Sequence, residues 1–225
     1  MKVLITAATA MEWLPAFTQI EKNYTDGSHG FTVSFHATGV GMLVSAVTLM
    51  QLVLLEQPDL VIQAGIAGCF DAAAPLGQVI AVRDEILGDT GVEEGGAWKD
   101  VFDLNLENPD SAPFTNKRLT NNQFDRYNLL GLPAVTGITV NEITTKSERK
   151  ALLTQKYSPY IESMEGAALH YVCGKLQVPY LQIRAVSNYI GERDKTKWKM
   201  KDAIVNLNTA LLDYIGKLGT TNVNF

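Results

Sequence analysis

Hydrophobic residues along this chain form short runs that alternate with longer segments of mixed polarity. The short runs predict strands at 2–8, 31–38, 60–62, 78–87, 134–140, about 160–164, and 180–187. In the second of these, every other residue is polar, which indicates a half-exposed strand rather than a buried one. The longer segments predict helices at 12–22, from 42 to the residue before Pro58, from about 147, at 166–177, and at about 201–218. Helix-length segments between short strands favour an α/β protein whose mixed sheet is covered by helices.

One segment, about 88–126, does not follow this alternation. It contains Gly91, Gly95, Gly96, Pro109 and Pro113 and shows little periodicity. A long irregular stretch inside a compact domain is usually functional or mobile. A surface excursion or a contact between subunits, with no ligand role, is the alternative interpretation. Residues 1–225 as a whole predict a single domain, with 88–126 as an insertion in it.

The composition is that of a folded protein that acts on small molecules. The 225 residues are 46% hydrophobic and carry a formal net charge of −5. A chain of this length buries about 70% of the surface that its unfolded form exposes. The acidic balance argues against nucleic acid or an anionic membrane as a partner, and the alternating lysines at 195–201 are interpreted as a solvated face. The longest apolar run, 42–55, is interrupted by polar residues and is too short to span a bilayer.

Cysteine and histidine are too few and too scattered for a disulfide framework or a zinc site. Cys69 and Cys173 lie far apart, and the three histidines are His29, His36 and His170. No metal is therefore expected. His170, in a predicted helix, is expected to pack or to lie on the surface. Two isolated thiols are typical of a protein in the reducing cytoplasm, which is the predicted location.

Three polar residues, Glu12, Glu165 and Asn188, lie at the ends of apolar strands, where α/β proteins place their ligands. Each of them also has an interpretation without a ligand. An acidic residue that leads into a helix interacts favourably with the helix dipole, and an asparagine often caps a helix or forms a turn. Taken singly, none of the three identifies a site.

Their joint arrangement resembles the purine nucleosidase and phosphorylase superfamily along nearly the whole chain. Residues 163–168 are similar to its E-M-E-x-x-A stretch, and residues 184–188 are similar to its R-A-I-S-D stretch. Residues 11–15 look like the segment with the water-activating glutamate of the methylthioadenosine/adenosylhomocysteine nucleosidases, and 64–68 occupy the place of their T-G-S-A-G loop. The resemblance implies a three-layer α/β/α single domain with a mixed, twisted central sheet. It also implies no cofactor and a homo-oligomer, expected to be a dimer.

The resemblance further implies a role for each site residue. Glu12 would deprotonate the attacking water, and Glu165 would bind the ribose hydroxyls. Cleavage of an N-glycosidic bond develops positive charge on the ribose and negative charge on the purine, so carboxylates on the sugar side and a donor on the base side suit this chemistry. Asn188 would be that donor. The other substrate-binding residues are expected to be Val40, Ala67, Gly68, Met164, Ser187 and Arg193.

Two departures from the superfamily pattern indicate which nucleophile the enzyme uses and which base it releases. The chain lacks the N-terminal arginine with which phosphorylases bind phosphate, and Ile66 replaces a serine or threonine, so water is the expected nucleophile. Asn188 replaces the aspartic acid of adenine-releasing enzymes. An asparagine NH₂ group can serve N7 and a 6-oxo acceptor together, which predicts hypoxanthine as the released base.

A hydrolase that releases hypoxanthine resembles the futalosine hydrolases of menaquinone biosynthesis, and the stretches 88–94, 102–104, 113–116 and 187–198 are similar to that family. Futalosine carries an aromatic carboxylate on its 5′ arm, so one cation is expected in the pocket. Arg193, Arg118 and Arg184 are the candidates in that order, with a solvated surface as the alternative for the first two and pocket support for Arg184. The alternative functions are a methylthioadenosine/adenosylhomocysteine nucleosidase and a non-catalytic nucleoside-binding protein.

Overall fold

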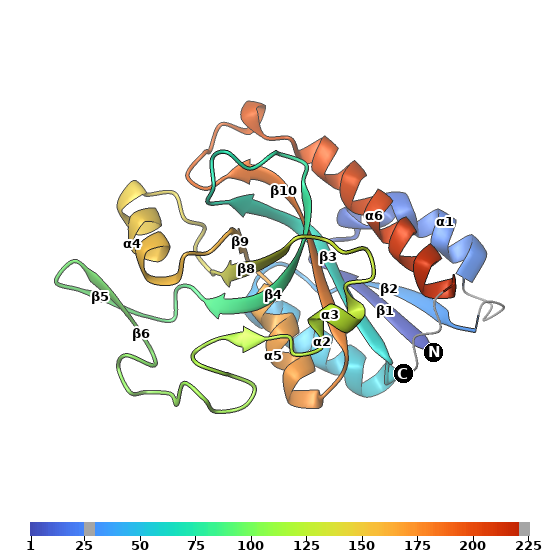
Figure 1. Ribbon diagram of the computed structural model, residues 1–225, viewed down its shortest axis with the longest axis horizontal. Helices are drawn as coiled ribbons and strands as arrows, with labels where there is room; N and C mark the ends of the chain where they lie inside the picture. Colours follow the sequence, from blue (N-terminus) through green and yellow to red (C-terminus); the bar gives the residue numbers. More distant parts are fainter. Residues whose placement is uncertain (25–29, 221–225) are drawn as a thin grey trace.

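The computed structural model describes residues 1–24 and 30–220, so His29 lies outside the described residues. A mixed sheet lies at the centre of the molecule (Figure 1). Its strands are β1 (Lys2–Ala7), β2 (Thr32–Ala37), β3 (Leu60–Cys69), β4 (Val79–Leu87), β7 (Leu119–Thr120), β8 (Ala134–Thr139), β9 (Ile161–Ser163) and β10 (Tyr180–Tyr189). They run in the order β10-β4-β8-β9-β3-β1-β2, and β7 pairs with β4. Because β10 also pairs with β3, five strands form a closed ring from which β1 and β2 extend.

The two long strands, β3 and β10, are parallel to each other and to β1. The sequence predicted a strand only at 60–62, yet the pairing of β3 with β10 continues to Cys69. Gly65 and Gly68 do not end the strand, and their missing side chains leave room for Arg184 and Ile190 of the neighbouring segment. Parallel pairing brings the carboxyl ends of these strands to one edge of the sheet.

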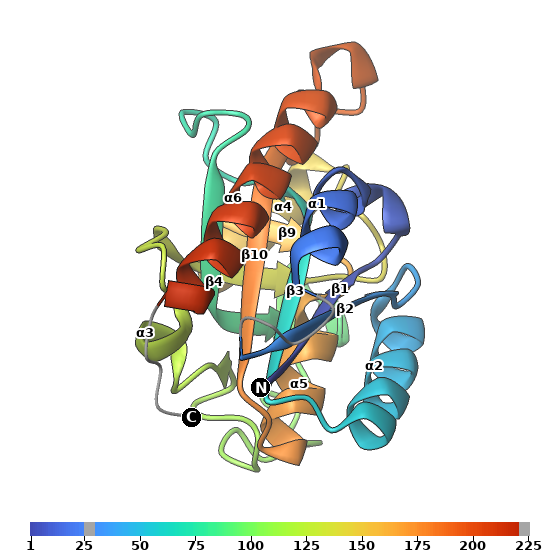
Figure 2. The same ribbon diagram turned by 90° about the vertical axis from the view of Figure 1, so that its right-hand side faces the viewer.

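Helices cover both faces of the sheet, and alternate residues of the same strands point to the two faces. Val3 and Ile5 of β1 pack in the cluster that contains α1 (Leu14–Tyr24) and α6 (Met200–Thr220). Leu4 packs on the other face, in the cluster that contains α2 (Met42–Glu56) and α5 (Gly166–Leu176). Figures 1 and 2 show these helical layers on either side of the sheet. The predicted three-layer α/β/α architecture is confirmed.

The helix α1 begins two residues later than the sequence pattern predicted. Glu12 belongs to a short 3₁₀ turn, η1 (Ala10–Glu12), and the α-helix starts at Leu14. Proline has no backbone N–H, so Pro15 fits only in the first turn of a helix. A start at Glu12 would have placed Pro15 where an intrahelical hydrogen bond is required. No helix within 1–24 and 30–220 is long and apolar enough to cross a membrane.

The segment 88–126 contains more regular structure than its sequence indicated, although its middle part, 101–118, has no helix or strand. The strands β5 (Gly91–Glu94) and β6 (Ala97–Asp100) form an antiparallel hairpin. Gly95 and Gly96 make its two-residue turn with φ of 58° and 76°, the left-handed geometry that hairpin turns favour and glycine adopts easily. The short helix α3 (Phe124–Tyr127) follows β7 near the end of the segment.

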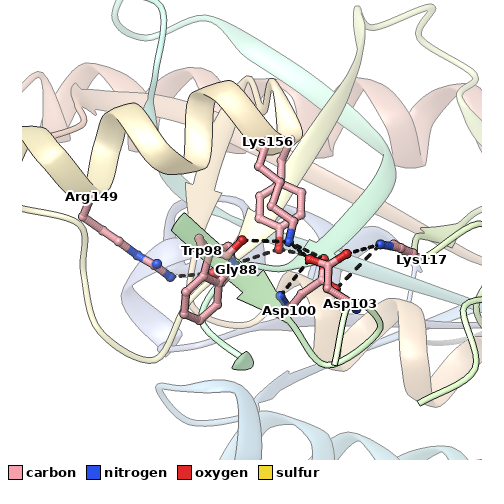
Figure 3. A network of polar contacts seen from close by, with 8 residues as sticks. Gly88, Trp98, Asp100, Asp103, Lys117, Arg149 and Lys156 are labelled. Carbon is pink, nitrogen blue, oxygen red and sulfur yellow. Dashed lines mark hydrogen bonds and ion pairs between the residues drawn. The ribbon is translucent and has the colours of Figure 1, made fainter. Parts of the chain in front are cut away.

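Charged side chains attach this segment to α4 (Ser147–Tyr157), as Figure 3 shows. Asp100 is only 2% exposed, and its carboxylate forms an ion pair with Lys156 Nζ at 2.9 Å. Lys156 also contacts Asp103, and Lys117 Nζ lies 2.6 Å from the same carboxylate. These contacts hold the pKa of Asp103 well below its usual range, with the hydrogen bond from Lys117 as the largest cause.

A second contact with α4 lies beside this network (Figure 3). The guanidinium of Arg149 stacks 3.8 Å from the ring centre of Trp98 and donates to the carbonyl of Gly88 at 2.8 Å. Trp98 Nε1 donates to the hydroxyl of Tyr157 at 2.9 Å. The hairpin is therefore held against α4 by ionic and aromatic contacts together.

Candidate active site

A cavity of about 420 Å³ opens at the carboxyl ends of β1, β3 and β10. The structure brings the catalytic and substrate-binding residues expected from the sequence to its wall: Glu12, Val40, Ala67, Gly68, Met164, Glu165, Ser187, Asn188 and Arg193. Larger cavities of about 510 and 740 Å³ lie elsewhere and contain none of these residues. Of the three, only the 420 Å³ cavity is lined by buried carboxylates, so chemistry rather than size marks it as the candidate site.

Glu12 is fixed at the cavity wall by the backbone around it. Its Oε2 accepts from the N–H of Thr9 at 3.0 Å, and its Oε1 accepts from the N–H of Ile66 at 3.2 Å. The turn η1 between β1 and α1 directs the side chain toward the end of β3, where Ile66 lies. Only 7% of the residue is exposed, so the carboxyl group has few water contacts.

The surroundings of Glu12 suit a general base. Burial raises the pKa of Glu12 above its usual value, and the nearby Glu165 adds to the rise. The guanidinium of Arg184 and the backbone N–H groups of Thr9 and Ile66 oppose that rise by stabilising the carboxylate. A carboxylate with a raised pKa is a stronger base than one in water, provided that it stays ionised.

Glu165 is the N-cap residue of α5, yet its side chain does not cap the helix. The hydroxyls of Ser163 and Thr139 accept from the first N–H groups of α5 instead, at 3.2 and 2.7 Å. The Glu165 carboxylate is therefore free to face the cavity, where its Oε1 accepts from the N–H of Gly41 at 2.9 Å. Gly41 precedes α2 with φ of 95°, which glycine adopts at little cost.

Arg184 lies behind both carboxylates rather than in the pocket opening. It is 1% exposed, donates to Gln63 Oε1 at 2.6 Å, and has a nitrogen 4.0 Å from Glu165 Oε2. A Cβ on Gly65 would come within 2.2 Å of Arg184 and 3.0 Å of Glu12 Oε1. Gly65 thus permits the close approach of guanidinium and carboxylate. Arg184 supports the pocket and is too buried to reach a substrate arm.

Asn188 lies at the end of β10, just after a register shift between Val186 and Asn188. Its Oδ1 accepts from the hydroxyl of Ser187 at 2.8 Å, and its Nδ2 donates to the carbonyl of Tyr189 at 3.2 Å. An amide NH₂ carries two N–H groups, so one donor remains for a ligand in the cavity. The carbonyl of Tyr189 can only accept, so it fixes which end of the amide is the donor.

Sequence reasoning missed one buried carboxylate of the wall. Glu162 of β9 is 5% exposed, and its Oε1 accepts from the N–H of Thr144 at 3.0 Å. Burial raises the pKa of Glu162, whereas its hydrogen bonds with Thr144 lower it. The signal was present, because Glu162 stands three residues before Glu165 and alternates with core residues in a short strand.

An apolar rim of the cavity was also missed: Met11, Ile143, Trp198, Met200 and Ile204. Arg193 lies beside this rim, with its guanidinium carbon 5.6 Å from the ring centre of Trp198. Arg118 lies elsewhere and donates to Thr136 Oγ1 at 3.3 Å. Among the predicted arginines, Arg193 is therefore the one that can meet a ligand in this cavity.

His170 and the alternating lysines, which the sequence analysis also discussed, lie outside the cavity. His170 is buried in α5, where burial lowers its pKa to about 4, and its Nδ1 lies 2.9 Å from the carbonyl of Leu119. The lysines at 195, 197, 199 and 201 are exposed. Within the described residues, no three His, Cys, Asp or Glu side chains form a group that could hold a metal ion.

Comparison with known proteins places this geometry in a family. The profile of the Phosphorylase superfamily matches residues 10–216. A futalosine hydrolase of Thermus thermophilus is 26% identical over 204 residues, which cover 86% of this chain and 85% of that protein. A futalosine hydrolase of Streptomyces coelicolor is 30% identical over 164 residues, which cover 71% of this chain and 65% of that protein.

Solved structures show the same fold. The 5′-methylthioadenosine/S-adenosylhomocysteine nucleosidase of Colwellia psychrerythraea, in complex with adenine, superposes with a TM-score of 0.75. The alignment covers 97% of this chain and 96% of that one at 22% identity. Because the superfamily profile spans nearly the whole chain, the protein belongs to the Phosphorylase superfamily.

Proposed function

We propose that this protein hydrolyses the N-glycosidic bond of futalosine, releasing hypoxanthine and dehypoxanthine futalosine. The observation that carries the proposal is the meeting of two buried carboxylates and one asparagine amide in a single cavity. Glu12 deprotonates the attacking water, Glu165 binds the ribose hydroxyls, and Asn188 donates to the departing base. Carboxylates stabilise the positive charge that develops on the ribose, and the amide donor stabilises the negative charge on the purine.

Water suits this cavity better than phosphate as the nucleophile. Glu12 and Glu165 would repel a phosphate anion, and the one guanidinium close to them, Arg184, already contacts Glu165 and Gln63. The N–H of Ile66, in the place of a phosphate-binding hydroxyl residue, donates to Glu12. These contacts support hydrolysis rather than phosphorolysis.

The 5′ arm of futalosine has a matching environment at the rim. The apolar side chains of Met11, Ile143 and Trp198 offer surface to the aromatic part of the arm. Arg193 lies among them, and within the described residues it has no ion pair with a carboxylate. A guanidinium in this position binds a carboxylate through two parallel hydrogen bonds.

A methylthioadenosine/adenosylhomocysteine nucleosidase is the second candidate, because the apolar rim would also accept a thioether arm. The solved structure from Colwellia carries that name and contains adenine. Asn188 separates the two candidates: its amide donor suits the 6-oxo group of hypoxanthine, whereas the 6-amino group of adenine requires an acceptor.

A base-release assay tests the proposal. The pure protein is incubated with futalosine, methylthioadenosine and inosine, and the free base is followed by chromatography. We expect hypoxanthine from futalosine at the highest rate. Release of adenine without hypoxanthine would overturn the proposal in favour of the second candidate, and no release of either base would support a non-catalytic nucleoside-binding protein.

We also propose that the protein acts as a homodimer in the cytoplasm, within menaquinone biosynthesis. The outer face of α2 carries Leu43, Val44, Val47, Met50, Leu54 and Leu55, which are between 45% and 83% exposed. Figure 2 shows α2 at the edge of the molecule. Met11 and Val40, which line the cavity, are also exposed apolar residues. A second copy would cover the outer face of α2, since apolar patches of this kind mark interaction sites. Both cysteines are free and buried, as suits a reducing compartment.

A further inference from the structure

Every backbone N–H group in the first turn of α5 has an acceptor other than the side chain of Glu165. The first four N–H groups of an α-helix have no partner within the helix. In α5 the third and fourth of them donate to the carbonyl of Glu165, at 3.1 and 3.4 Å. The first donates to Ser163 Oγ at 3.2 Å, and the second, that of Ala167, donates to Thr139 Oγ1 at 2.7 Å.

The N–H of Ala167 is the donor that Glu165 would otherwise use. The side chain of an N-cap residue typically accepts from the N–H two or three positions further on, and Ala167 is two residues after Glu165. The positive end of the helix dipole strengthens the attraction of a carboxylate to this turn. Ala167 is 1% exposed, so water is a poor substitute for a missing acceptor. Glu165 therefore has two competing donors, Gly41 at the cavity and Ala167 in its own helix.

Thr139 of β8 occupies the N–H of Ala167, and Glu85 of β4 orients the hydroxyl that does so. Both side chains are fully buried. Thr139 Oγ1 donates its only hydrogen to Glu85 Oε1 at 3.0 Å, which leaves its lone pairs for Ala167. An ionised and a protonated carboxyl group can both accept at this oxygen. A Cβ on Gly166 would come within 2.3 Å of Glu85 Oε2, so the absent side chain lets Glu85 lie against the first turn of α5.

We propose that Thr139 is a positioning residue for Glu165. By accepting from Ala167, it removes the donor that would draw the carboxylate back onto α5, and Glu165 stays with Gly41 at the cavity wall. The proposal rests on the proposed function, since it concerns the carboxylate assigned to the ribose hydroxyls. Thr139 is buried outside the cavity wall, so it acts on the ribose only through Glu165.

A nucleoside and a free base, bound to the full chain, separate ribose binding from base binding. The probes are 9-deazainosine, whose base is joined to the ribose through carbon and is not released by hydrolysis, and hypoxanthine, which has no ribose. Thr139→Val keeps the shape of the side chain and removes the hydroxyl. We expect its affinity for 9-deazainosine to fall about 10- to 100-fold, as when hydrogen bonds to a charged group are lost, with little change for hypoxanthine. Calorimetry measures both affinities.

Two variants serve as controls for the ratio of the two affinities. Thr139→Ser keeps the hydroxyl and should restore the wild-type ratio. Thr136→Val removes a hydroxyl from the same strand, but one that accepts from Arg118 and does not contact α5, so it should also keep that ratio. A wild-type ratio in Thr139→Val would overturn the proposal. Equal losses of affinity for both probes would also overturn it, because they would indicate a general structural defect.

A second substitution covers the case in which Thr139→Val fails to fold, as a melting curve would reveal. Thr139→Cys then decides, because its sulfur is only a weak acceptor and the ratio should fall in the same direction. An unchanged ratio in that variant would overturn the proposal.

The outcomes also separate this inference from the proposed function. A wild type that releases hypoxanthine from futalosine, together with a wild-type ratio in Thr139→Val, would overturn the role of Thr139 alone. A wild type that releases adenine without hypoxanthine would overturn the proposed function. The role of Thr139 would then be decided by the same ratio, measured with 9-deazaadenosine and adenine.

Discussion

Arg184 is a buried guanidinium that faces carboxylates instead of solvent. It lies 4.0 Å from Glu165 and lowers the pKa of Glu12. The two carboxylates nevertheless have different hydrogen bonds, since Glu12 is held by Thr9 and Ile66 and Glu165 by Gly41. One cation therefore keeps two acidic groups in the same cavity, and each is directed by its own backbone donors.

Replacing Glu12, the proposed general base, should lower the rate of turnover much more than the affinity for the nucleoside. Glu12→Gln keeps the shape of the side chain but cannot accept a proton, so we expect the rate of base release to fall about 100-fold or more. Affinity for the nucleoside should change little. Steady-state kinetics check this, with the exposed Glu148→Gln as a control. A variant with near-normal turnover would show that another group activates the water.

Base preference should follow the residue at 188. Asn188→Asp replaces the NH₂ donor with a carboxyl group, which accepts from a 6-amino group when ionised. We expect weaker action on futalosine and inosine and a gain in relative action on adenine nucleosides. The ratio of hypoxanthine to adenine released from a mixture of inosine and adenosine measures the change. An unchanged ratio would assign the preference to other residues.

Glu85 predicts how stability depends on pH. It is fully buried in β4, and burial raises its pKa to about 7, against the opposing effect of Arg184. Because the folded protein holds this proton more tightly than the unfolded chain, the stabilising contribution is complete below pH 4.5 and is lost as pH rises through about 7. Deprotonation of Glu85 should therefore lower the free energy of unfolding by on the order of 3 kcal/mol.

Glu85→Gln should remove this pH dependence. The amide keeps the volume and can accept from Thr139, which donates to Glu85 at 3.0 Å in the wild type. Urea unfolding at pH 5, 6, 7 and 8 would then show a smaller decline in the free energy of unfolding than the wild type shows. Equal declines in both proteins would contradict the assignment of this titration to Glu85.

At the scale of elements, α4 and the hairpin β5–β6 stabilise each other through Lys156. Lys156→Met should destabilise the fold by about 1–3 kcal/mol, since it leaves the buried Asp100 with the more distant Lys117, 3.8 Å away. Urea unfolding at pH 7 measures this, with Lys201→Met of α6, an exposed lysine, as the control. No difference between the two variants would contradict it.

Low pH should weaken the contact between Lys156 and Asp103, because it protonates the Asp103 carboxylate. The pKa of Asp103 is lowered by Lys117 and Lys156, so its stabilising contribution is present above its ordinary pKa of 3.8 and is lost as pH falls below that value. Lys156→Met should therefore lose less stability between pH 5 and pH 2 than the wild type. An identical acid dependence would show that the ion pair is screened by solvent.

Helices and strands whose own sequence shows a clear hydrophobic pattern could be predicted. Those that form because of contacts with other parts of the fold could not. The runs at 2–8 and 180–187 indicated strands because most of their positions are apolar, although Lys2 begins the first run and Gln182 and Arg184 interrupt the second. The turn at Gly95–Gly96 is a hairpin signal, but its flanking residues Glu93, Glu94 and Lys99 lack the apolar alternation of a strand. That hairpin is defined by its contacts with α4.

The candidate site follows the same rule. Glu12, Glu165 and Asn188 lie near strand ends, and it was their joint resemblance to the superfamily motifs that located them in the sequence. Ile143 and Trp198 lie in loops after β8 and before α6, and the path of these loops is set by tertiary contacts such as Thr144 with Glu162 and Trp198 Nε1 with the carbonyl of Glu192. No local pattern places a loop side chain in a cavity.

At the scale of the whole molecule, the exposed face of α2 predicts self-association. Charges at Val47 and Leu54 would be buried in a dimer, so the double variant Val47→Glu/Leu54→Glu should be monomeric at concentrations where the wild type is dimeric. Sedimentation analysis measures this. Val205→Glu, on the exposed side of α6, is the matched control. A wild type that is monomeric at all concentrations would contradict the dimer.

The same helix reaches into the cavity at its other end. The backbone N–H of Gly41, just before α2, donates to Glu165, while the outer face of α2 would carry the second copy. A shift of α2 on association would thus move a donor to Glu165, the carboxylate that we propose binds the ribose. Thermodynamic reciprocity then requires that ligand binding tighten the assembly by the factor by which assembly tightens ligand binding. Dilution should weaken nucleoside affinity, and saturating nucleoside should hold the subunits together.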